Sequence, residues 1–167
     1  MKIALLMGSD SDLTRLQTTL DILARLGIPH EARVLSAHRT PAQLIEYVQT
    51  SAPETGVYIC AAGGAAHLAG VVAAHTIRPV IGIPMDNPPL GGLDALLSTV
   101  QMPGGVPVAA VGAGAGGPVN AALMAARILA LADPELKERL LTFVQEQAEL
   151  VLKKDERVRA KTAIKSS

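Results

Sequence analysis

Residues 3–12 read Ile-Ala-Leu-Leu-Met-Gly-Ser-Asp-Ser-Asp and join an apolar, strand-like run to a glycine–serine loop. The same arrangement occurs twice more, where Ser36–Pro41 follows residues 32–35 and Gly63–His67 follows Val57–Ala61. In an open parallel α/β sheet, the loops at the carboxyl ends of neighbouring strands line one crevice, and ligands bind there. We therefore expect hydroxyls, backbone amides, one arginine, one aspartate and two histidines to face a single pocket.

Strand and helix patterns alternate along almost the whole chain. Strands are expected at Lys2–Met7, His30–Leu35, Val57–Ala61, Pro79–Ile83 and Val106–Val111. Helices are expected at Asp12–Leu26, from Pro41 to before Pro53, at Ala65–Thr76, near Leu93–Val100, at Pro118–Leu131 and from Pro134 to about Lys154. This alternation predicts a three-layer α/β/α sandwich around a parallel, flavodoxin- or Rossmann-like sheet of about five strands.

The length of 167 residues fits one domain, which we expect at residues 1–155 with a polar tail at 156–167. Two expected helices, 65–76 and 120–132, are apolar around most of their circumference. A helix that is hydrophobic all round is normally buried on every side. A domain of this size cannot cover its own outer layer, so we expect a homo-oligomer with an apolar interface.

Composition excludes several classes of protein. The net charge is zero at pH 7, whereas a nucleic-acid-binding domain normally carries a basic patch, so no nucleic-acid partner is expected. No apolar stretch reaches the ~20 residues of a membrane-spanning helix, and the N-terminal apolar run is too short for a signal peptide. Cys60 is the only cysteine and lies in an apolar run, which favours a buried thiol. We expect a soluble, cytoplasmic protein.

The segment Gly8–Asp12 has the composition of an anion site. A glycine–serine turn that enters a helix offers free backbone amides and the positive end of the helix dipole. Ser9 and Ser11 add hydroxyl donors. An aspartate beside a phosphate would repel it, so at least one acid should face elsewhere, and Asp12 can accept hydrogen bonds from ribose hydroxyls. The alternative, that Asp10 or Ser11 only caps the helix, is equally open.

The segment Ser36–Pro41 contains two residues that helix capping does not explain. Thr40 and Pro41 are typical of a helix start. Arg39 suits bidentate recognition of a phosphate. His38 is a candidate acid or base, because histidine is the residue that most often serves as a general acid or base at neutral pH. A solvated, non-functional pair is the alternative, but the strand-end position favours a functional one.

The remaining histidines have different expected roles. His67 is expected in the first turn of a glycine-entered helix, where the dipole disfavours an imidazolium, so a neutral ring that binds a ligand is plausible. We expect His75 to be structural or at an interface, and we assign no role to His30. Because HxH, HExxH and CxxC patterns are absent from the sequence, no metal site is expected.

Residues 112–117 formally match the dinucleotide fingerprint G-x-G-x-x-G. That fingerprint normally lies in the first strand–helix unit, with an acid about 20 residues further on at the end of the next strand. Here it follows the fifth expected strand, and Asp133 falls at a helix cap. We therefore expect no dinucleotide cofactor, and the sequence contains no P-loop pattern for ATP.

Four motifs in sequence order resemble the PurE family, and the resemblance runs from about Ile3 to Leu152. They are Gly8-Ser9-x-Ser11-Asp12, Ser36-Ala37-His38-Arg39-Thr40-Pro41, Gly63-Gly64-Ala65-Ala66-His67-Leu68 and Val100-Gln101-Met102-Pro103-Gly104-Gly105. Bacterial members of this family are 5-(carboxyamino)imidazole ribonucleotide mutases of purine biosynthesis. The resemblance implies a homo-octamer that needs neither cofactor nor metal and moves a carboxylate from the exocyclic nitrogen of the substrate to ring carbon 4.

The resemblance also implies roles for individual residues. His38 would protonate the departing nitrogen and later remove the proton from carbon 4, with carbon dioxide trapped in between. The phosphate would be bound by Ser9, Ser36 and Arg39, and the ribose by Asp12. The carboxylate pocket would be lined by Gly64, Ala65, His67 and Leu68.

Three alternatives stay open from the sequence: a direct aminoimidazole ribonucleotide carboxylase, a divergent paralogue acting on a related nucleotide, and a non-catalytic nucleotide-monophosphate binding module. The direct carboxylases of the family typically have lysine where Arg39 stands and lack the pattern that ends in His67, which favours the mutase. The glycine-rich loop departs from the family, because Ala115 stands where a lysine is usual.

Overall fold

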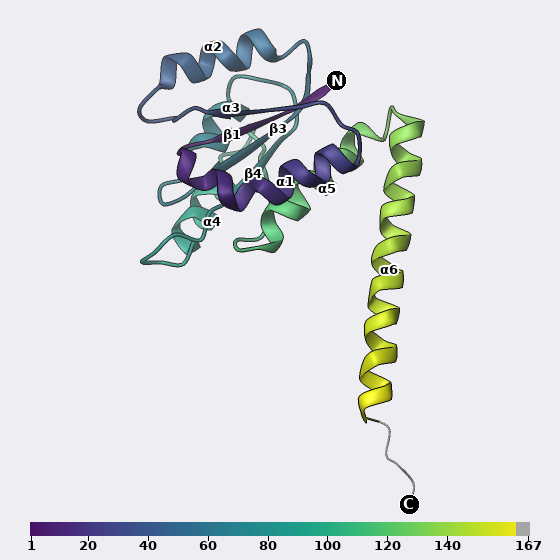
Figure 1. The fold of residues 1–167 in the computed structure, drawn as a ribbon. Helices are drawn as coiled ribbons and strands as arrows, with labels where there is room; N and C mark the ends of the chain where they lie inside the picture. The colour runs from purple at the N-terminus through teal and green to yellow at the C-terminus, as the bar shows by residue number, and fades with distance from the viewer. Residues whose placement is uncertain (163–167) are drawn as a thin grey trace, which may run out of the picture.

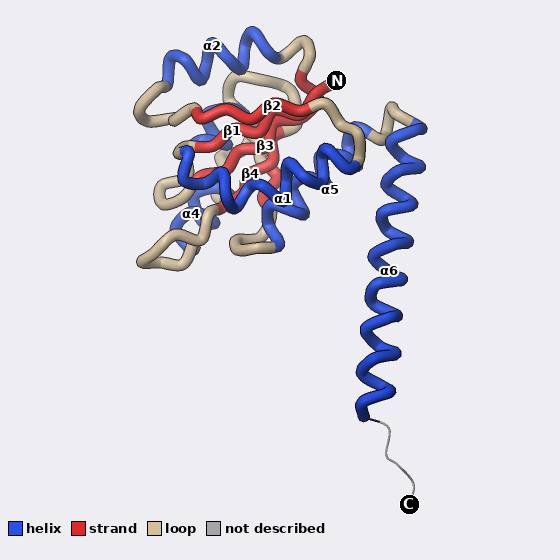
Figure 2. Tube along the Cα trace, viewed as in Figure 1, coloured by secondary structure: helices blue, strands red, loops and turns tan. Residues whose placement is uncertain are grey.

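The computed structural model describes residues 1–162 and contains one sheet of five parallel strands in the order β2-β1-β3-β4-β5. The strands are β1 (Lys2–Met7), β2 (His30–Val34), β3 (Thr55–Ala62), β4 (Val80–Pro84) and β5 (Ala109–Ala110). Helices pack on both faces of this sheet (Figure 1, Figure 2). The predicted three-layer α/β/α sandwich with a flavodoxin-like parallel sheet is therefore confirmed.

The central strands explain why the apolar runs in the sequence are continuous. In β1, Leu5 is aligned with Ala32 of β2 on one side and with Ile59 of β3 on the other. Residues 3–7 of β1 and 55–61 of β3 are all buried. A strand covered on both faces cannot alternate apolar with polar residues, so it is apolar throughout.

The helices form two separate apolar cores, one on each face of the sheet. They are a 3₁₀ turn η1 (Asp10–Asp12), α1 (Leu13–Arg25), α2 (Pro41–Ser51), α3 (Leu68–Ala73), α4 (Leu93–Val100), α5 (Gly116–Leu129) and α6 (Pro134–Thr162). One core joins α1, α5 and the start of α6 to the sheet, through residues such as Leu16 and Ala122. The other joins α2 and α3 to the opposite face, through residues such as Leu44 and Val72.

Two elements are shorter than the sequence predicts. The strand expected at Val106–Val111 pairs with β4 only at Ala109–Ala110. It is the edge of the sheet, and Pro107 has no N–H to donate to a ladder. The helix expected at Ala65–Thr76 is limited to Leu68–Ala73, and His67 occupies its N-cap position instead of its first turn.

The last helix is longer than the sequence predicts. It continues to Thr162, whereas we expected it to end near Lys154, and residues 155–162 contain neither glycine nor proline to stop it. The rest of the predicted tail, 163–167, lies outside the described residues. Leu136, Leu140 and Phe143 of α6 are buried against the body, but every residue from 147 to 162 is exposed. Figure 1 shows this second half standing away from the sandwich.

The glycine-rich segment 112–117 has a structural explanation. Gly114 adopts a positive φ of 86°, a conformation that glycine takes at little steric cost. A Cβ atom on Gly117 would lie 2.2 Å from the carbonyl oxygen of Gly112. Two of these glycines are thus required by the turn that enters α5.

Candidate active site

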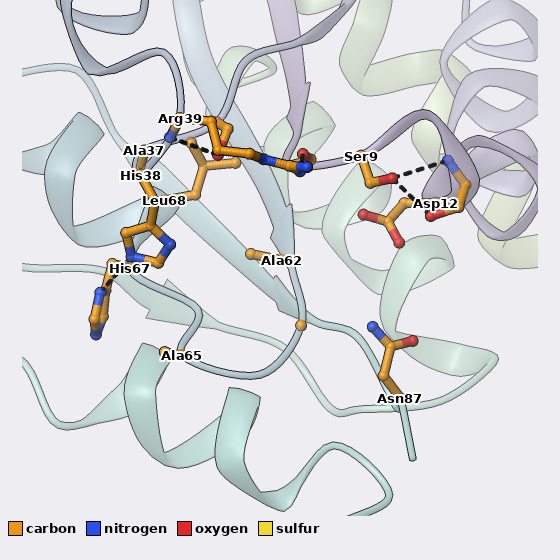
Figure 3. Close-up of a pocket in the computed structure, with 14 residues that line it drawn as sticks. Ser9, Asp12, Ala37, His38, Arg39, Ala62, Ala65, His67, Leu68 and Asn87 are labelled. Atoms are coloured by element: carbon orange, nitrogen blue, oxygen red, sulfur yellow. Dashed lines mark hydrogen bonds between the residues drawn. The ribbon is translucent and has the colours of Figure 1, made fainter. Parts of the chain in front are cut away.

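A cavity of about 420 Å³ opens at the carboxyl ends of four neighbouring strands, β2, β1, β3 and β4. Its lining comes from the three predicted loops, from Ala62 at the end of β3, from Leu68 at the start of α3 and from one residue after β4 (Figure 3). The lining residues are Gly8, Ser9, Ser11, Asp12, Ser36, Ala37, His38, Arg39, Ala62, Gly63, Ala65, His67, Leu68 and Asn87. The volume falls in the range of small-molecule sites, roughly 300–1,000 Å³.

The first loop is closed by hydrogen bonds among its own serines. Ser9 Oγ accepts from the backbone N–H of Ser11 at 3.3 Å and from Ser11 Oγ at 2.8 Å. Ser9 therefore caps the short 3₁₀ turn that leads into α1, and both hydroxyls remain in the wall of the cavity. Asp10 is exposed and does not line this cavity, although it borders an adjoining one with Ser9 and Arg39, whereas Asp12 is buried and lines this cavity.

Asp12 is a buried acid with a perturbed titration. Burial raises the pKa of the Asp12 carboxyl above its usual value, because desolvation disfavours the charged form. The guanidinium of Arg15, one helical turn further on, and a backbone hydrogen bond in the Ser9 turn act in the opposite direction. Such a carboxylate is well suited to accept hydrogen bonds from a ligand, which would replace the lost water.

The second loop holds Arg39 in a defined position across the cavity. Ser36 Oγ accepts from the backbone N–H of Arg39 at 3.2 Å. The Arg39 guanidinium donates through Nη2 to the Gly8 carbonyl at 3.0 Å, so it ties the second loop to the first. Thr40 occupies the N-cap position of α2 as predicted, but its side chain makes no capping hydrogen bond to the helix. Its Oγ1 accepts from the Ser36 N–H at 2.9 Å instead.

The two predicted histidines meet. His38 Nε2 and His67 Nδ1 are 2.7 Å apart, and the rings are perpendicular with centroids 4.9 Å apart. A hydrogen bond at this distance needs an N–H on one ring and a lone pair on the other. The pair can therefore share one proton between two imidazoles that come from different loops, as Figure 3 shows at one end of the cavity.

The cavity lining differs from the predicted site at Gly64, which was predicted and does not line it, and at Ala62 and Asn87, which line it and lie outside the three predicted loops. Gly64 has a positive φ of 63° and shapes the third loop, but it does not itself line the cavity, whereas its neighbours Gly63 and Ala65 do. Asn87 lines the cavity and was missed. The available signal was its place just after β4, in the turn-rich stretch 84–92 that follows the fourth expected strand and to which we assigned no ligand-binding role.

Ala115 lies in a separate cavity of about 290 Å³ that also contacts Arg15 and Asp86. The positive charge in this second cavity comes from Arg15 of α1. Arg15 Nη1 donates to Asp86 Oδ1 at 2.6 Å and to Asn87 Oδ1 at 3.1 Å. Arg15 therefore contacts the main cavity indirectly, through its hydrogen bond to Asn87, which lines that cavity.

The other titratable candidates are accounted for by local structure. His30 Nδ1 lies 2.8 Å from the Ile28 carbonyl, and His75 Nδ1 lies 2.8 Å from the Val71 carbonyl. Cys60 is buried, and burial raises the pKa of its thiol. Within residues 1–162, no group of three or more His, Cys, Asp or Glu side chains is arranged to hold a metal ion. None of the helices in this part of the chain is long and apolar enough to cross a membrane.

Comparisons with known proteins give a consistent result. Residues 2–150 match the family model described as AIR carboxylase. A protein of Pseudomonas aeruginosa named N5-carboxyaminoimidazole ribonucleotide mutase is 48% identical over 151 residues, which is 90% of this chain and 93% of that protein. A protein of Bacillus subtilis with the same name is 51% identical over 140 residues, 83% of this chain and 86% of that protein.

The fold is similar to that of a solved relative. The crystal structure of Treponema denticola PurE superposes with a TM-score of 0.85 at 28% sequence identity. The superposition covers 94% of this chain and 98% of that one. The similarity therefore extends over the sheet and both helical layers.

Proposed function

We propose that this chain, which belongs to the AIR carboxylase (PurE) family, is an N5-carboxyaminoimidazole ribonucleotide mutase of purine biosynthesis. It is an isomerase, because it moves a carboxylate within one molecule, from the exocyclic nitrogen to ring carbon 4. The observation that carries the proposal is the cavity, which combines a proton-sharing histidine pair with groups suited to a ribose phosphate.

The ribose phosphate would occupy the end of the cavity away from the histidines. Ser9, Ser36 and Arg39 would bind the phosphate, since hydroxyls and a guanidinium are strong donors to phosphate oxygens. The anchorage of Arg39 on the Gly8 carbonyl supports this role, because a guanidinium already held in place loses less freedom on binding. Buried Asp12 would accept hydrogen bonds from ribose hydroxyls.

The imidazole ring and its carboxylate would then lie against His38. Loss of carbon dioxide from the exocyclic nitrogen leaves an electron pair there, and His38 supplies the proton that nitrogen takes up. Carbon 4 next attacks the retained carbon dioxide, and His38 removes the proton that carbon 4 releases. The proton returns to its donor, so the reaction has no net proton change. A group that serves first as acid and then as base works best with a pKa near the operating pH.

The rest of the cavity would hold the carbon dioxide. Ala65 and Leu68 have apolar side chains, Gly63 has no side chain, and Leu68 is buried. Apolar walls exclude water, and a site closed to water also limits the loss of carbon dioxide to the solvent. His67 would keep His38 oriented through the 2.7 Å contact. We propose no cofactor and no metal for the reaction.

Activity assays on the purified protein, without ATP or added metal, would test this function. One receives N5-carboxyaminoimidazole ribonucleotide, and the other receives aminoimidazole ribonucleotide with bicarbonate. We expect fast turnover in the first assay only. Turnover in the second alone would make the protein a direct carboxylase, and silence in both would indicate a related nucleotide as substrate. A His38→Asn variant that still binds nucleotide but turns over as fast as the wild type would contradict the mechanism.

We further propose that the protein is a homo-oligomer, with the octamer of the family as the expected form. Support comes from large apolar side chains that the single chain leaves exposed, including Leu93, Leu97 and Val100 on α4 and Ile77 before β4. Light scattering would give the mass, and a monomer at micromolar concentration would contradict the proposal. A phosphorylated substrate does not cross membranes freely, which supports action in the cytoplasm.

A further inference from the structure

We propose that Asn87 is an additional substrate-binding residue that donates from its side-chain amide to a ribose hydroxyl, and that Arg15 is the positioning residue that fixes the direction of that amide. The identity of the ligand as a ribose phosphate rests on the proposed function. Asn87 is half-buried and lines the main cavity, and Arg15 lies on α1 outside it.

Arg15 determines which end of the Asn87 amide faces the cavity. An asparagine amide has an acceptor end and a donor end, and its hydrogen bonds decide which is which. Arg15 Nη1 donates to Asn87 Oδ1 at 3.1 Å and to Asp86 Oδ1 at 2.6 Å. A guanidinium is only a donor, so it holds the oxygen of Asn87 and leaves the nitrogen on the other side.

The nitrogen of Asn87 points over the third loop. A Cβ atom built on Gly63 would lie only 2.2 Å from Asn87 Nδ2, so the amide rests directly on the bare backbone of this glycine. Among the hydrogen bonds of residues 1–162, Nδ2 donates to no protein acceptor. Its N–H groups are therefore available to a ligand in the cavity.

The neighbour of Asn87 in the cavity identifies the acceptor. Figure 3 shows Asn87 and Asp12 at the end of the cavity opposite to the His38–His67 pair. Asp12 accepts and Asn87 donates, which is the combination that a hydroxyl needs, because a hydroxyl both donates one hydrogen bond and accepts others. A phosphate oxygen or an imidazole carboxylate would be repelled by Asp12. A ribose hydroxyl is the part of the substrate that fits both groups.

The binding role differs from a purely structural one in a measurable way. If Asn87 served only to accept from Arg15 and brace the loop, Asn87→Asp would preserve that role, because a carboxylate accepts at least as well. If Asn87 donates to the ribose, the same variant loses the donor. The added negative charge weakens the binding of every anion, so the affinity for inorganic phosphate serves as the reference for that effect.

Calorimetric titrations with ribose 5-phosphate and with inorganic phosphate would test the proposal. We expect Asn87→Asp to lower the affinity for ribose 5-phosphate about tenfold more than it lowers the affinity for phosphate. This difference corresponds to the loss of one hydrogen bond. Arg15→Gln should weaken ribose 5-phosphate about threefold, raise KM for the nucleotide by the same factor and leave kcat unchanged. In an Asn87→Ala background, Arg15→Gln should have no further effect, because Arg15 acts through Asn87.

Arg25→Gln is the matched control. Arg25 is on the same helix, α1, is about as exposed as Arg15, and forms an ion pair with Glu146 far from the cavity. It should change neither affinity.

Equal weakening of both ligands by Asn87→Asp would overturn the proposal, as would a wild type that binds ribose 5-phosphate no better than phosphate. Additive effects of Arg15→Gln and Asn87→Ala would overturn the positioning role. These titrations need no turnover. A protein that is inactive on the nucleotide but passes them would contradict the proposed function and leave this inference standing.

Discussion

The two ends of the cavity are built differently. At the binding end, Ser9, Ser36 and Arg39 are each fixed by hydrogen bonds to the chain, and Asp12 is buried. At the reacting end, His38 and His67 are exposed, and the hydrogen bond between them is the one that each ring makes among residues 1–162. A side chain that only binds the ligand binds it more tightly when its orientation is fixed. A side chain that donates and accepts a proton needs a hydrogen-bond partner that fits both its protonated and its neutral form.

The largest effect should come from removing the acid–base group. We expect His38→Asn to lower kcat by about a thousandfold, the usual magnitude of a general acid–base contribution. The affinity for ribose 5-phosphate should stay within about twofold, because the binding end is untouched. Stopped-flow assays and calorimetry would measure the two quantities. If the affinity for ribose 5-phosphate falls by as large a factor as kcat does, His38 contributes to binding as well as to proton transfer.

The next largest effect should appear at the binding end. We expect Arg39→Gln to raise KM by about 10- to 100-fold, since a hydrogen bond to a charged group contributes roughly 1.5–3 kcal/mol. kcat should change little, because the reacting atoms lie at the other end of the cavity. Steady-state kinetics would show the split, and a fall in kcat with an unaltered KM would show that Arg39 belongs to the reacting end.

Loss of the histidine pair should have an intermediate consequence. His67→Phe keeps an aromatic ring but removes the nitrogen that faces His38 Nε2. We expect kcat to fall about tenfold, the equivalent of one lost hydrogen bond, and the pH–rate profile to move because His38 loses its partner. A profile and a kcat identical to those of the wild type would mean that His67 has no part in proton transfer.

The smallest expected effect concerns stability. Burial raises the pKa of Asp12 in the folded chain, so its charged form destabilises the free protein. This group favours folding below the unfolded pKa near 3.8, and that contribution is lost as the pH rises through the folded pKa. Asp12→Asn should therefore raise Tm at pH 7 by on the order of 1–3 °C, while weakening ribose binding.

The gain from Asp12→Asn should shrink as the pH falls through the raised pKa of Asp12 in the folded chain, and it should vanish below about 3.8, where the wild-type carboxyl is protonated in both the folded and the unfolded state. Thermal unfolding at a series of pH values would measure it. A variant less stable than the wild type at pH 7 would show that Asp12 is stabilised by its contacts more than it is penalised by burial.

The sheet and the three loops could be predicted because they depend on local patterns. Apolar runs such as residues 3–7 mark strands buried on both faces, and each loop begins where a glycine or a serine interrupts the run. The limits of β5 could not be predicted from hydrophobicity, since Pro107 and the edge position decide where pairing stops. Likewise, the sequence shows no signal that ends α6, and the helix continues to Thr162.

Contacts between distant residues were the part of the site that sequence patterns do not contain. His38 and His67 are 29 residues apart, so their shared hydrogen bond depends on the parallel packing of β1 between β2 and β3. Asn87 enters the cavity because Gly63 has no side chain and because Arg15 reaches across from α1. Each of these residues can be read from the sequence, but the contacts between them are a property of the fold.

The exposed half of α6 has a consequence for hydrodynamics. A helix of 29 residues is about 43 Å long at 1.5 Å per residue, and its outer half has no contact with the sandwich. A free subunit would therefore sediment more slowly than a sphere of its mass. An assembly that packs the rod between neighbouring subunits would have a frictional ratio close to that of a compact particle. Sedimentation velocity would thus report where this helix lies, in addition to how many chains associate.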